Sequence, residues 1–393
     1  MKVLQVTPFY PPNIGGIADH VYNITQNLRH FDTEITIVSP KRLQSQQDDG
    51  DCGNIQIYSI YLPPWPYPTL KNFSIPIDLG LRIDKIIRNG NFDLVHTHGL
   101  HYVFSWRAIY SAHKNHIPNI MTLHGAYSLN PYKTGGKTII EEYFNKIVFS
   151  RLLARIDGVI GITEKTTNHA RLFGGPNLNC ITIPNGINLD PFVKNRSQKN
   201  LLRQKYRFSC DSTVVLFCGR FEHVKGILEF ASAAKKIVNE FLNVEILVVG
   251  EGSLKDKVIN LLDHCPRIHL LNWQPHDSLH EIYILSDVFV IPSRFEGLPI
   301  TILEAMAASL HILYTPVGSL PEILEDYSSK TMIKESNTQE IYLNLKRVIG
   351  NGFDSFVFDY DLSEIIPFDW KNITLKIYQF YQSILESEHR IRD

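Results

Sequence analysis

The chain has 393 residues, 44% of them hydrophobic and 20% charged, which excludes a disordered or fibrous protein. This length exceeds one ordinary hydrophobic core and predicts two or three domains. The formal net charge is −1, so no general attraction to nucleic acid is expected. The five cysteines form no Cys-x-x-Cys pair, which argues against a disulfide framework or zinc ribbon and favours a reducing cytoplasm.

Short β-branched runs alternate with longer helix-like stretches along the whole chain. Because the strand-like runs are mostly apolar without interruption, they are typical of a parallel sheet covered on both faces. The alternation occurs twice and predicts an α/β fold with two doubly wound domains. Strands are expected at 2–7, 34–39, 94–97, 119–123, 158–162 and 180–183, then at 213–218, 244–249, 268–271, 288–291 and 311–314. Helices in the first half are expected at 17–30, 79–89, 105–115, 139–154 and 164–172.

A turn signal, Pro184-Asn185-Gly186, separates the two halves. We expect one domain over 1–186 and a second over 187–369. An apolar-aromatic stripe over 370–386 predicts a final helix that packs on a domain. The N-terminus lacks the apolar region of a signal peptide, and no run of about eighteen apolar residues predicts a membrane span.

Histidines gather at the end of one predicted strand. His96, His98 and His101 resemble a set of metal ligands, and His96 and His98 share one face of the strand. No cysteine or carboxylate lies at ligand spacing from them. We therefore favour a strand-end site lining a cleft, and expect no metal site.

Glycines and cations follow two other predicted strands. Gly15 and Gly16 precede a helix, where backbone N–H groups and the helix dipole favour a phosphate. Arg220 and Lys225 lie just past a buried strand in a loop framed by glycines, an arrangement that suits a diphosphate. Taken alone, these patterns also fit a tight turn and an ordinary surface loop.

The most specific cluster surrounds a predicted helix start. Pro299 suits the first helical position, which places Gly297 and Leu298 at a helix mouth with free N–H groups. Glu296 lies in the loop before it and Glu304 lies inside the helix. A loop carboxylate can accept hydrogen bonds from sugar hydroxyls, and a helical one can bind a vicinal diol.

Together these motifs resemble a known family. Phe-Glu-Gly-Leu-Pro-x4-Glu-Ala-Met-Ala, which contains Glu296 and Glu304, looks like the signature of the retaining, nucleotide-sugar-dependent glycosyltransferases of family 4. The Gly-Arg-x4-Lys-Gly loop, Pro-Asn-Gly-Ile-Asn, Gly-Glu-Gly and the N-terminal Gly-Gly loop occur in the family's order. The resemblance covers nearly the whole chain. It implies the GT-B architecture, two Rossmann-like domains facing across a cleft, with helix 370–393 packing back on the N-terminal domain.

The resemblance also implies how a donor is bound. Arg220 and Lys225 would hold the donor diphosphate, and Glu304 would bind the nucleotide ribose. Glu296 would bind the transferred sugar, helped by backbone N–H groups at Gly297 and Leu298. The C-terminal domain would thus bind the nucleotide sugar, and the N-terminal domain would present the acceptor side.

His124, in Thr-Leu-His-Gly at a strand end, matches the family histidine that contacts the donor sugar. We therefore expect His124, Arg220, Lys225 and Glu296 to be catalytic, with Gly15 and Gly16 among the donor-binding residues. The chain departs from the family's usual pattern in the C-terminal domain, since Ser319 stands where a second glycine is common.

These implications predict a cytoplasmic, metal-independent, retaining glycosyltransferase of the hexosyltransferase type without a cofactor. It would move a sugar from a UDP-, GDP- or other nucleoside-diphosphate sugar to a hydroxyl of a glycan or lipid-linked saccharide. Cell-surface polysaccharide or glycoconjugate synthesis is the expected setting. A GT-B nucleotide-sugar epimerase and a non-catalytic nucleotide-sugar-binding protein stay open as alternatives.

The charge and composition of the N-terminal domain, the expected acceptor side, predict a weak association with a membrane. Residues 1–190 carry a net charge of +3, and the rest of the chain carries −4. Aromatic and basic residues mix in two stretches, 65–88 and 139–155, and such mixtures can seat a helix on an anionic bilayer. An ordinary buried helix with a solvated edge fits the second stretch equally well.

Overall fold

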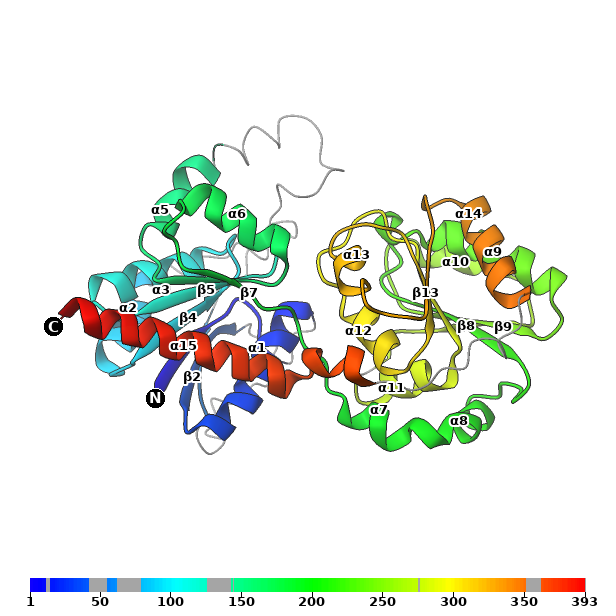
Figure 1. Cartoon of the computed structure of the whole chain (residues 1–393), viewed down its shortest axis with the longest axis horizontal. Helices are drawn as coiled ribbons and strands as arrows, with labels where there is room; N and C mark the ends of the chain where they lie inside the picture. Colours follow the sequence, from blue (N-terminus) through cyan, green and yellow to red (C-terminus); the bar gives the residue numbers. More distant parts are fainter. Residues whose placement is uncertain are drawn as a thin grey trace. The chain divides into compact units, whose positions relative to one another are not determined.

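The computed structural model (Figure 1) describes residues 1–11, 15–41, 55–61, 79–125, 143, 145–274, 276–350 and 362–392. The chain divides into two compact units. Unit 1 comprises Met1–Gly186 and Trp370–Asp393, and unit 2 comprises Ile187–Asp369.

Unit 1 contains a seven-stranded parallel sheet in the order β3-β2-β1-β4-β5-β6-β7. Its central strands are buried along their whole length, because helices cover both faces of the sheet. The strands are β1 (Lys2–Val6), β2 (Glu34–Lys41), β3 (Ile55–Tyr61), β4 (Leu94–His98), β5 (Asn119–Leu123), β6 (Gly158–Gly161) and β7 (Cys180–Thr182).

Two layers of helices enclose this sheet. The first, with α1 and α15, packs its apolar stripe on strands including β1 and β2, and the second packs on the opposite face. The helices are α1 (Gly16–Leu28), α2 (Leu79–Asn89), α3 (Val103–Lys114), α5 (Ser150–Leu153), α6 (Glu164–Gly174) and α15 (Trp370–Arg392), with a π-helical turn at Asn145–Phe149 and a 3₁₀ turn at Arg29–Phe31.

Unit 2 repeats the architecture with a six-stranded parallel sheet in the order β10-β9-β8-β11-β12-β13. This 3-2-1-4-5-6 order is that of a Rossmann fold. The strands are β8 (Thr213–Cys218), β9 (Val244–Val249), β10 (Ile268–Leu271), β11 (Val288–Ile291), β12 (His311–Tyr314) and β13 (Lys330–Met332).

The helices of unit 2 again lie in two layers, each with its own apolar core against the sheet. They are α7 (Asp190–Asn195), α8 (Lys199–Lys205), α9 (Ile227–Glu240), α10 (Lys255–Leu262), α11 (His276–Leu285), α12 (Ile300–Ala307), α13 (Leu320–Ile323) and α14 (Thr338–Gly350). Short 3₁₀ turns lie at Arg196–Gln198, His223–Lys225, Leu362–Glu364 and Ile366–Phe368. Two Rossmann-like α/β domains are thus confirmed.

The structure corrects three expectations about elements. Strands β3 and β13 were not predicted, because both lie at a sheet edge and lack an unbroken apolar run. The expected helix over 139–154 is, in its described part, a π-helical turn followed by the four residues of α5; residues 139–142 and 144 lie outside the described residues. Helix α12 begins at Ile300, with Pro299 extended at its N-cap, so the helix mouth starts one residue later than expected.

Helix α15 lies beside α1 in unit 1 (Figure 1). Its apolar stripe, which includes Trp370, Ile373 and Tyr381, is buried in the same core as β1 and β2. Residues from the far end of the chain therefore complete the first domain. Among the described residues, no helix has the length and apolar character needed to cross a membrane.

Candidate functional site

The predicted cations follow the first strand of unit 2. Arg220 lies two residues past β8 and is exposed; among the described residues, no side chain pairs with its guanidinium group. Lys225 ends a single 3₁₀ turn, and Gly226 then adopts a φ of +67°. A Cβ on Gly226 would lie 2.3 Å from the carbonyl oxygen of Pro292, so glycine lets this loop pack directly against the loop after β11.

Lys225 and Glu296 form an ion pair between these two loops. The Lys225 Nζ lies 2.5 Å from Glu296 Oε1 and 2.7 Å from Oε2, with side-chain exposures of 18% and 6%. Ser293 donates a third hydrogen bond to Glu296 Oε1 at 2.6 Å. The carboxylate is therefore held in place by a cation and a hydroxyl before any ligand arrives.

A tight backbone contact holds the loop that carries Glu296. Gly318 has a φ of +64°, and a Cβ there would lie 2.2 Å from the Glu296 carbonyl oxygen. Ser319, where the family often has a second glycine, donates its hydroxyl to the Gly297 carbonyl oxygen at 2.6 Å. The departure from the family pattern thus adds a hydrogen bond at the site instead of removing a contact. A Cβ on Gly297 would meet no atom within 4 Å, while Leu298 is buried.

Glu304 lies in α12 and is almost fully buried. Burial and then the charge of Glu304 raise the pKa of the Cys218 thiol to about 12. Burial, the Cys218 thiol and Glu304 likewise raise the pKa of Tyr283 well above its usual value. Cys218 and Tyr283 therefore stay protonated at neutral pH, and Cys218 is not a reactive thiol.

In unit 1, Gly15 caps α1 and Gly16 begins it. Gly15 has a φ of +145°, and a Cβ on either glycine would meet no atom within 4 Å. Among the described residues, the space in front of both glycines at the helix N-terminus is therefore open. Residues 12–14, which precede them, lie outside the described residues.

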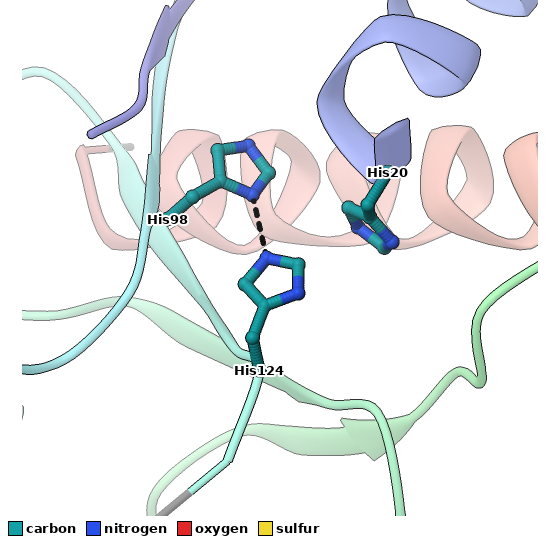
Figure 2. Close-up of side chains that lie close together, drawn as sticks. All are labelled: His20, His98 and His124. Atoms are coloured by element: carbon teal, nitrogen blue, oxygen red, sulfur yellow. Dashed lines mark hydrogen bonds between the residues drawn. The ribbon is translucent and has the colours of Figure 1, made fainter. Parts of the chain in front are cut away.

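A cluster of imidazole rings lies at the carboxyl end of the unit 1 sheet. It is formed by His20 of α1, His98 at the end of β4 and His124 just after β5 (Figure 2). The His98 Nδ1 lies 3.2 Å from the His124 Nε2, and the His20 and His124 ring centroids are 4.6 Å apart. Of the predicted strand-end histidines, His98 and His124 belong to this cluster, whereas His96 and His101 do not. His20, which was not predicted, comes from α1.

A chain of hydrogen bonds anchors the cluster to α15. His98 Nε2 lies 2.7 Å from Gln5 Oε1, and Gln5 Nε2 donates to the Tyr381 hydroxyl at 3.1 Å. The same hydroxyl lies 2.7 Å from His96 Nδ1, whose Nε2 lies 2.7 Å from the Thr122 hydroxyl. All of these groups are buried, so the network satisfies polar atoms that would otherwise be costly inside the core.

Burial keeps the imidazoles neutral. It lowers the pKa of His20 to about 4, although the hydrogen bond to Asn185 opposes the shift. It also holds the pKa of His96, His98 and His124 well below 6.5, and repulsion between neighbouring imidazoles adds to the effect. At the carboxyl ends of the sheets the two units thus differ, with neutral imidazoles in unit 1 and an ion pair in unit 2.

Sequence reasoning missed four residues that organise unit 1, namely Gln5, His20, Asn185 and Tyr381. The only signal for these side chains was Gln5, a polar residue inside an apolar strand; Asn185 lies in the turn motif that predicted only the domain boundary. Aspartates able to bind a divalent cation also occur as two Asp-x-Asp triplets, Asp49-Gly50-Asp51 and Asp359-Tyr360-Asp361. Both triplets lie outside the described residues, so the expectation of metal independence stays a prediction.

Two family models together account for most of the chain. The model "Glycosyltransferase Family 4" matches residues 14–191, and the model "Glycosyl transferases group 1" matches residues 198–355. The chain is a family-4-like glycosyltransferase of the GT-B type. The signature glutamates Glu296 and Glu304 lie in the second matched segment, and His20, His98 and His124 lie in the first.

Relatives of this glycosyltransferase match it over nearly its whole length. An uncharacterized glycosyltransferase of Methanocaldococcus jannaschii is 25% identical, over 98% of this chain and 99% of its own. The phosphatidylinositol N-acetylglucosaminyltransferase GPI3 subunit of Saccharomyces cerevisiae is 22% identical, over 98% of this chain and 83% of its own. The crystal structure of Anabaena HepE in complex with UDP shares the fold, with a TM-score of 0.71 and 16% identity over 98% of this chain and all of the other. HepE has also been solved with UDP-glucose.

Proposed function

We propose that this glycosyltransferase is a retaining, metal-independent enzyme that uses a nucleoside-diphosphate sugar. The acceptor is the hydroxyl of a glycan or lipid-linked saccharide. The observation that carries the proposal is the largely buried Lys225–Glu296 pair, held by Ser293, with Lys225 in the same loop as Arg220, which is exposed and has no side-chain partner among the described residues. HepE, which shares the fold, binds UDP and UDP-glucose, and this supports a nucleotide-sugar donor.

The charges of unit 2 suit a departing diphosphate. In the proposed reaction the acceptor oxygen bonds to the anomeric carbon on the face from which the diphosphate leaves. The leaving phosphate oxygen takes the acceptor proton, so the anomeric configuration is retained. Arg220 and Lys225 would stabilise the charge that develops on the diphosphate, an effect of roughly 3–4 kcal/mol for each well-placed donor.

The two glutamates are proposed to divide donor recognition. Glu304 would accept hydrogen bonds from the ribose hydroxyls, and Glu296 from hydroxyls of the transferred sugar, together with the backbone N–H groups of Gly297 and Leu298. His124 is proposed to contact the same sugar. The N-terminus of α1 at Gly15 and Gly16 is proposed to bind the phosphates of the donor.

Isothermal titration with UDP, GDP and ADP and with their sugars tests the proposal and identifies the base. Glu304→Ala should weaken binding of the free diphosphate and of the intact donor to a similar degree. Glu296→Ala should weaken the intact donor much more, since only the donor carries the sugar. Equal losses for both ligands in both variants would contradict the division of roles. An inverted anomer in the product, seen by NMR, would contradict retention.

We also propose peripheral attachment to the cytoplasmic face of a membrane, in the setting of surface polysaccharide or glycoconjugate synthesis. Within α2, Leu81 is 74% exposed, and Lys85 and Arg88 are also exposed. Of the other residues that suggested this role, 65–73 and 139–142 lie outside the described residues. The protein should sediment with anionic liposomes at low salt and stay in the supernatant at high salt. Lys85→Glu/Arg88→Glu should abolish this binding, whereas Lys236→Glu/Lys257→Glu in unit 2 should not.

A further inference from the structure

The imidazole cluster of unit 1 presents three nitrogen atoms toward one another. One nitrogen each from His20, His98 and His124 lies within 4.8 Å of the other two. His20 and His98 are fully buried, and His124 is partly exposed. Figure 2 shows the three rings arriving from α1, from the end of β4 and from the segment after β5. What such a group can bind depends on which nitrogen of each ring carries a lone pair.

Asn185 determines the tautomer of His20. The His20 Nδ1 lies 2.9 Å from Asn185 Oδ1; since a carbonyl oxygen only accepts, Nδ1 carries the proton and donates. The Nε2 of this neutral ring therefore holds a lone pair. This Nε2 is buried and makes no hydrogen bond with any described residue. A buried hydrogen-bond acceptor without a partner lowers the stability of the fold, which suggests that this nitrogen binds a ligand.

Gln5 determines the tautomer of His98 by the same reasoning. The Gln5 amide is oriented by its Nε2, which donates to the Tyr381 hydroxyl at 3.1 Å. Its Oε1 therefore faces His98 Nε2 at 2.7 Å, and His98 Nε2 must donate. The lone pair of His98 then lies on Nδ1, the atom that faces His124 at 3.2 Å.

His124 can provide the third lone pair by a change of tautomer. Without a ligand its Nε2–H donates to the lone pair of His98. With the proton on Nδ1 instead, the His124 Nε2 becomes a third lone pair, 3.2 Å from His98 Nδ1. Tetrahedral zinc with nitrogen ligands at 2.0–2.1 Å needs nitrogen atoms about 3.4 Å apart. The His98–His124 pair is already close to this spacing, and one nitrogen of His20 lies within 4.8 Å of a nitrogen of each of the other two rings.

We propose that His20 Nε2, His98 Nδ1 and His124 Nε2 form a site for one transition-metal ion of the Zn²⁺ class. Three neutral imidazoles suit Zn²⁺, Cu²⁺ or Ni²⁺ and not Mg²⁺ or Ca²⁺, which prefer oxygen ligands. Asn185 and Gln5 place a carbonyl oxygen against the other ring nitrogen of His20 and of His98, as is usual for histidines that bind a metal.

One consequence rests on the proposed function of His124. The metal and the donor sugar would compete for this ring, so the ion would inhibit transfer instead of assisting it. The three histidines belong to unit 1 and the diphosphate cations belong to unit 2, and metal-independent transfer is compatible with this site. If His124 does not contact the sugar, metal binding persists without inhibition, so the two proposals fail in different ways.

Two variants remove one ligand atom each while keeping the hydrogen bond behind it. In His20→Asn the side-chain amide can still donate to Asn185 from near the Nδ1 position but has no atom at Nε2. In His98→Gln the amide can donate to Gln5 from near the Nε2 position but has no atom at Nδ1. His264→Asn, whose side chain is 92% exposed and lies in unit 2, is the matched control.

Co²⁺ provides a direct readout, because a tetrahedral Co²⁺ site absorbs strongly in visible light. The metal-stripped protein should show this spectrum at one equivalent of Co²⁺, and Zn²⁺ should displace it. Both ligand variants should lose the spectrum and bind Zn²⁺ about a hundredfold or more weakly, while His264→Asn keeps both properties. Circular dichroism establishes that each variant is folded.

A spectrum that survives in His20→Asn and His98→Gln, or a wild-type protein with no spectrum, would overturn the site. Crystals of the unmodified protein soaked in ZnCl₂ give a second test that needs no variant. An anomalous peak between the three rings at the zinc edge supports the proposal. Zinc that scatters only at surface histidines rejects it.

Discussion

The two sheets share one strand order, but the side chains at their carboxyl ends differ in charge. In unit 2, ions gather there: Lys225 pairs with Glu296, and Arg220 is exposed and unpaired within the described residues. In unit 1, neutral rings and amides gather at the same edge, with His98 bonded to Gln5 and facing His124. The order of strands therefore fixes where a site lies, but the residues at the strand ends decide which ligand it suits. An ionic edge fits a charged diphosphate, whereas a neutral edge fits a metal ion or an uncharged sugar.

The largest expected effect is the loss of an ion from unit 2. Arg220→Ala should lower turnover about a hundredfold or more, because the guanidinium group stabilises the leaving diphosphate. The fold should stay intact, since Arg220 is exposed. Steady-state kinetics and thermal melting check both parts, with the exposed Lys257→Ala as the control. Near-normal turnover in folded Arg220→Ala would contradict the proposal that the diphosphate binds at this edge of the sheet.

Lys225→Ala should separate the two cations of unit 2. It should lower turnover similarly but also lower the free energy of unfolding by about 3 kcal/mol, because it leaves the buried Glu296 carboxylate without its cation. Urea unfolding measures this difference. The double variant Lys225→Ala/Glu296→Gln should recover part of the lost stability but not the turnover. Equal stabilities of Lys225→Ala and Arg220→Ala would mean that the pair contributes nothing to the folded state.

A backbone substitution tests how firmly the ionic edge is held. Gly318→Ala should lower the free energy of unfolding by about 2–3 kcal/mol, since φ is +64° and the new Cβ would meet the Glu296 carbonyl oxygen at 2.2 Å. Gly297→Ala adds the same methyl group 21 residues earlier, in open space, and should leave the unfolding transition unchanged. Equal effects of the two substitutions would contradict the contact between Gly318 and Glu296.

The neutral edge predicts a dependence of stability on pH. The pKa of His20 is about 4 in the folded protein and near 6.5 in the unfolded chain. The unfolded state therefore binds more protons between these values, and stability falls as pH drops from about 6.5 toward 4. His20 alone should remove about 2 kcal/mol between pH 7.5 and pH 5. Urea unfolding of the wild type and of His20→Asn measures its share; identical pH profiles would show that His20 is not buried as a neutral ring.

The smallest expected effect is that of a chelator. Transfer should survive EDTA, because Arg220 and Lys225 supply the charge that a divalent cation would otherwise provide. If the imidazole cluster holds inhibitory metal, EDTA should raise the rate slightly. Loss of activity that Mg²⁺ or Mn²⁺ restores would reject metal independence and direct attention to the aspartates at 49–51 and 359–361.

The sequence predicted the central strands well because each is an unbroken apolar run, as β8 and β9 show. It failed for β3 and β13, whose alternating or polar residues at sheet edges do not differ from loop sequence. In unit 2, Arg220, Lys225, Glu296 and Glu304 lie within short motifs, so their grouping could be recognised. His20 and Asn185 lie 165 residues apart, and no spacing rule connects them.

The histidines show the same limit in more detail. Spacing grouped His96, His98 and His101, but alternate residues of one strand can still have different partners. His96 contacts Tyr381 and Thr122, whereas His98 faces His124. Only the order of strands, which places the end of β4 beside that of β5, brings this pair together.

Helix α15 has a consequence for the order in which the protein acquires its structure during synthesis. The ribosome completes all of unit 2 before it makes Trp370, Ile373 and Tyr381, which are buried in unit 1. The second domain can therefore fold first, while in the first domain the part of one sheet face that α15 covers stays exposed, although α1 covers another part. Until Tyr381 emerges, the Gln5 amide also lacks the hydroxyl that orients it toward His98. The first domain to be translated would thus be the last to mature, and truncation within α15 would leave nascent chains prone to aggregate through that exposed part of the sheet.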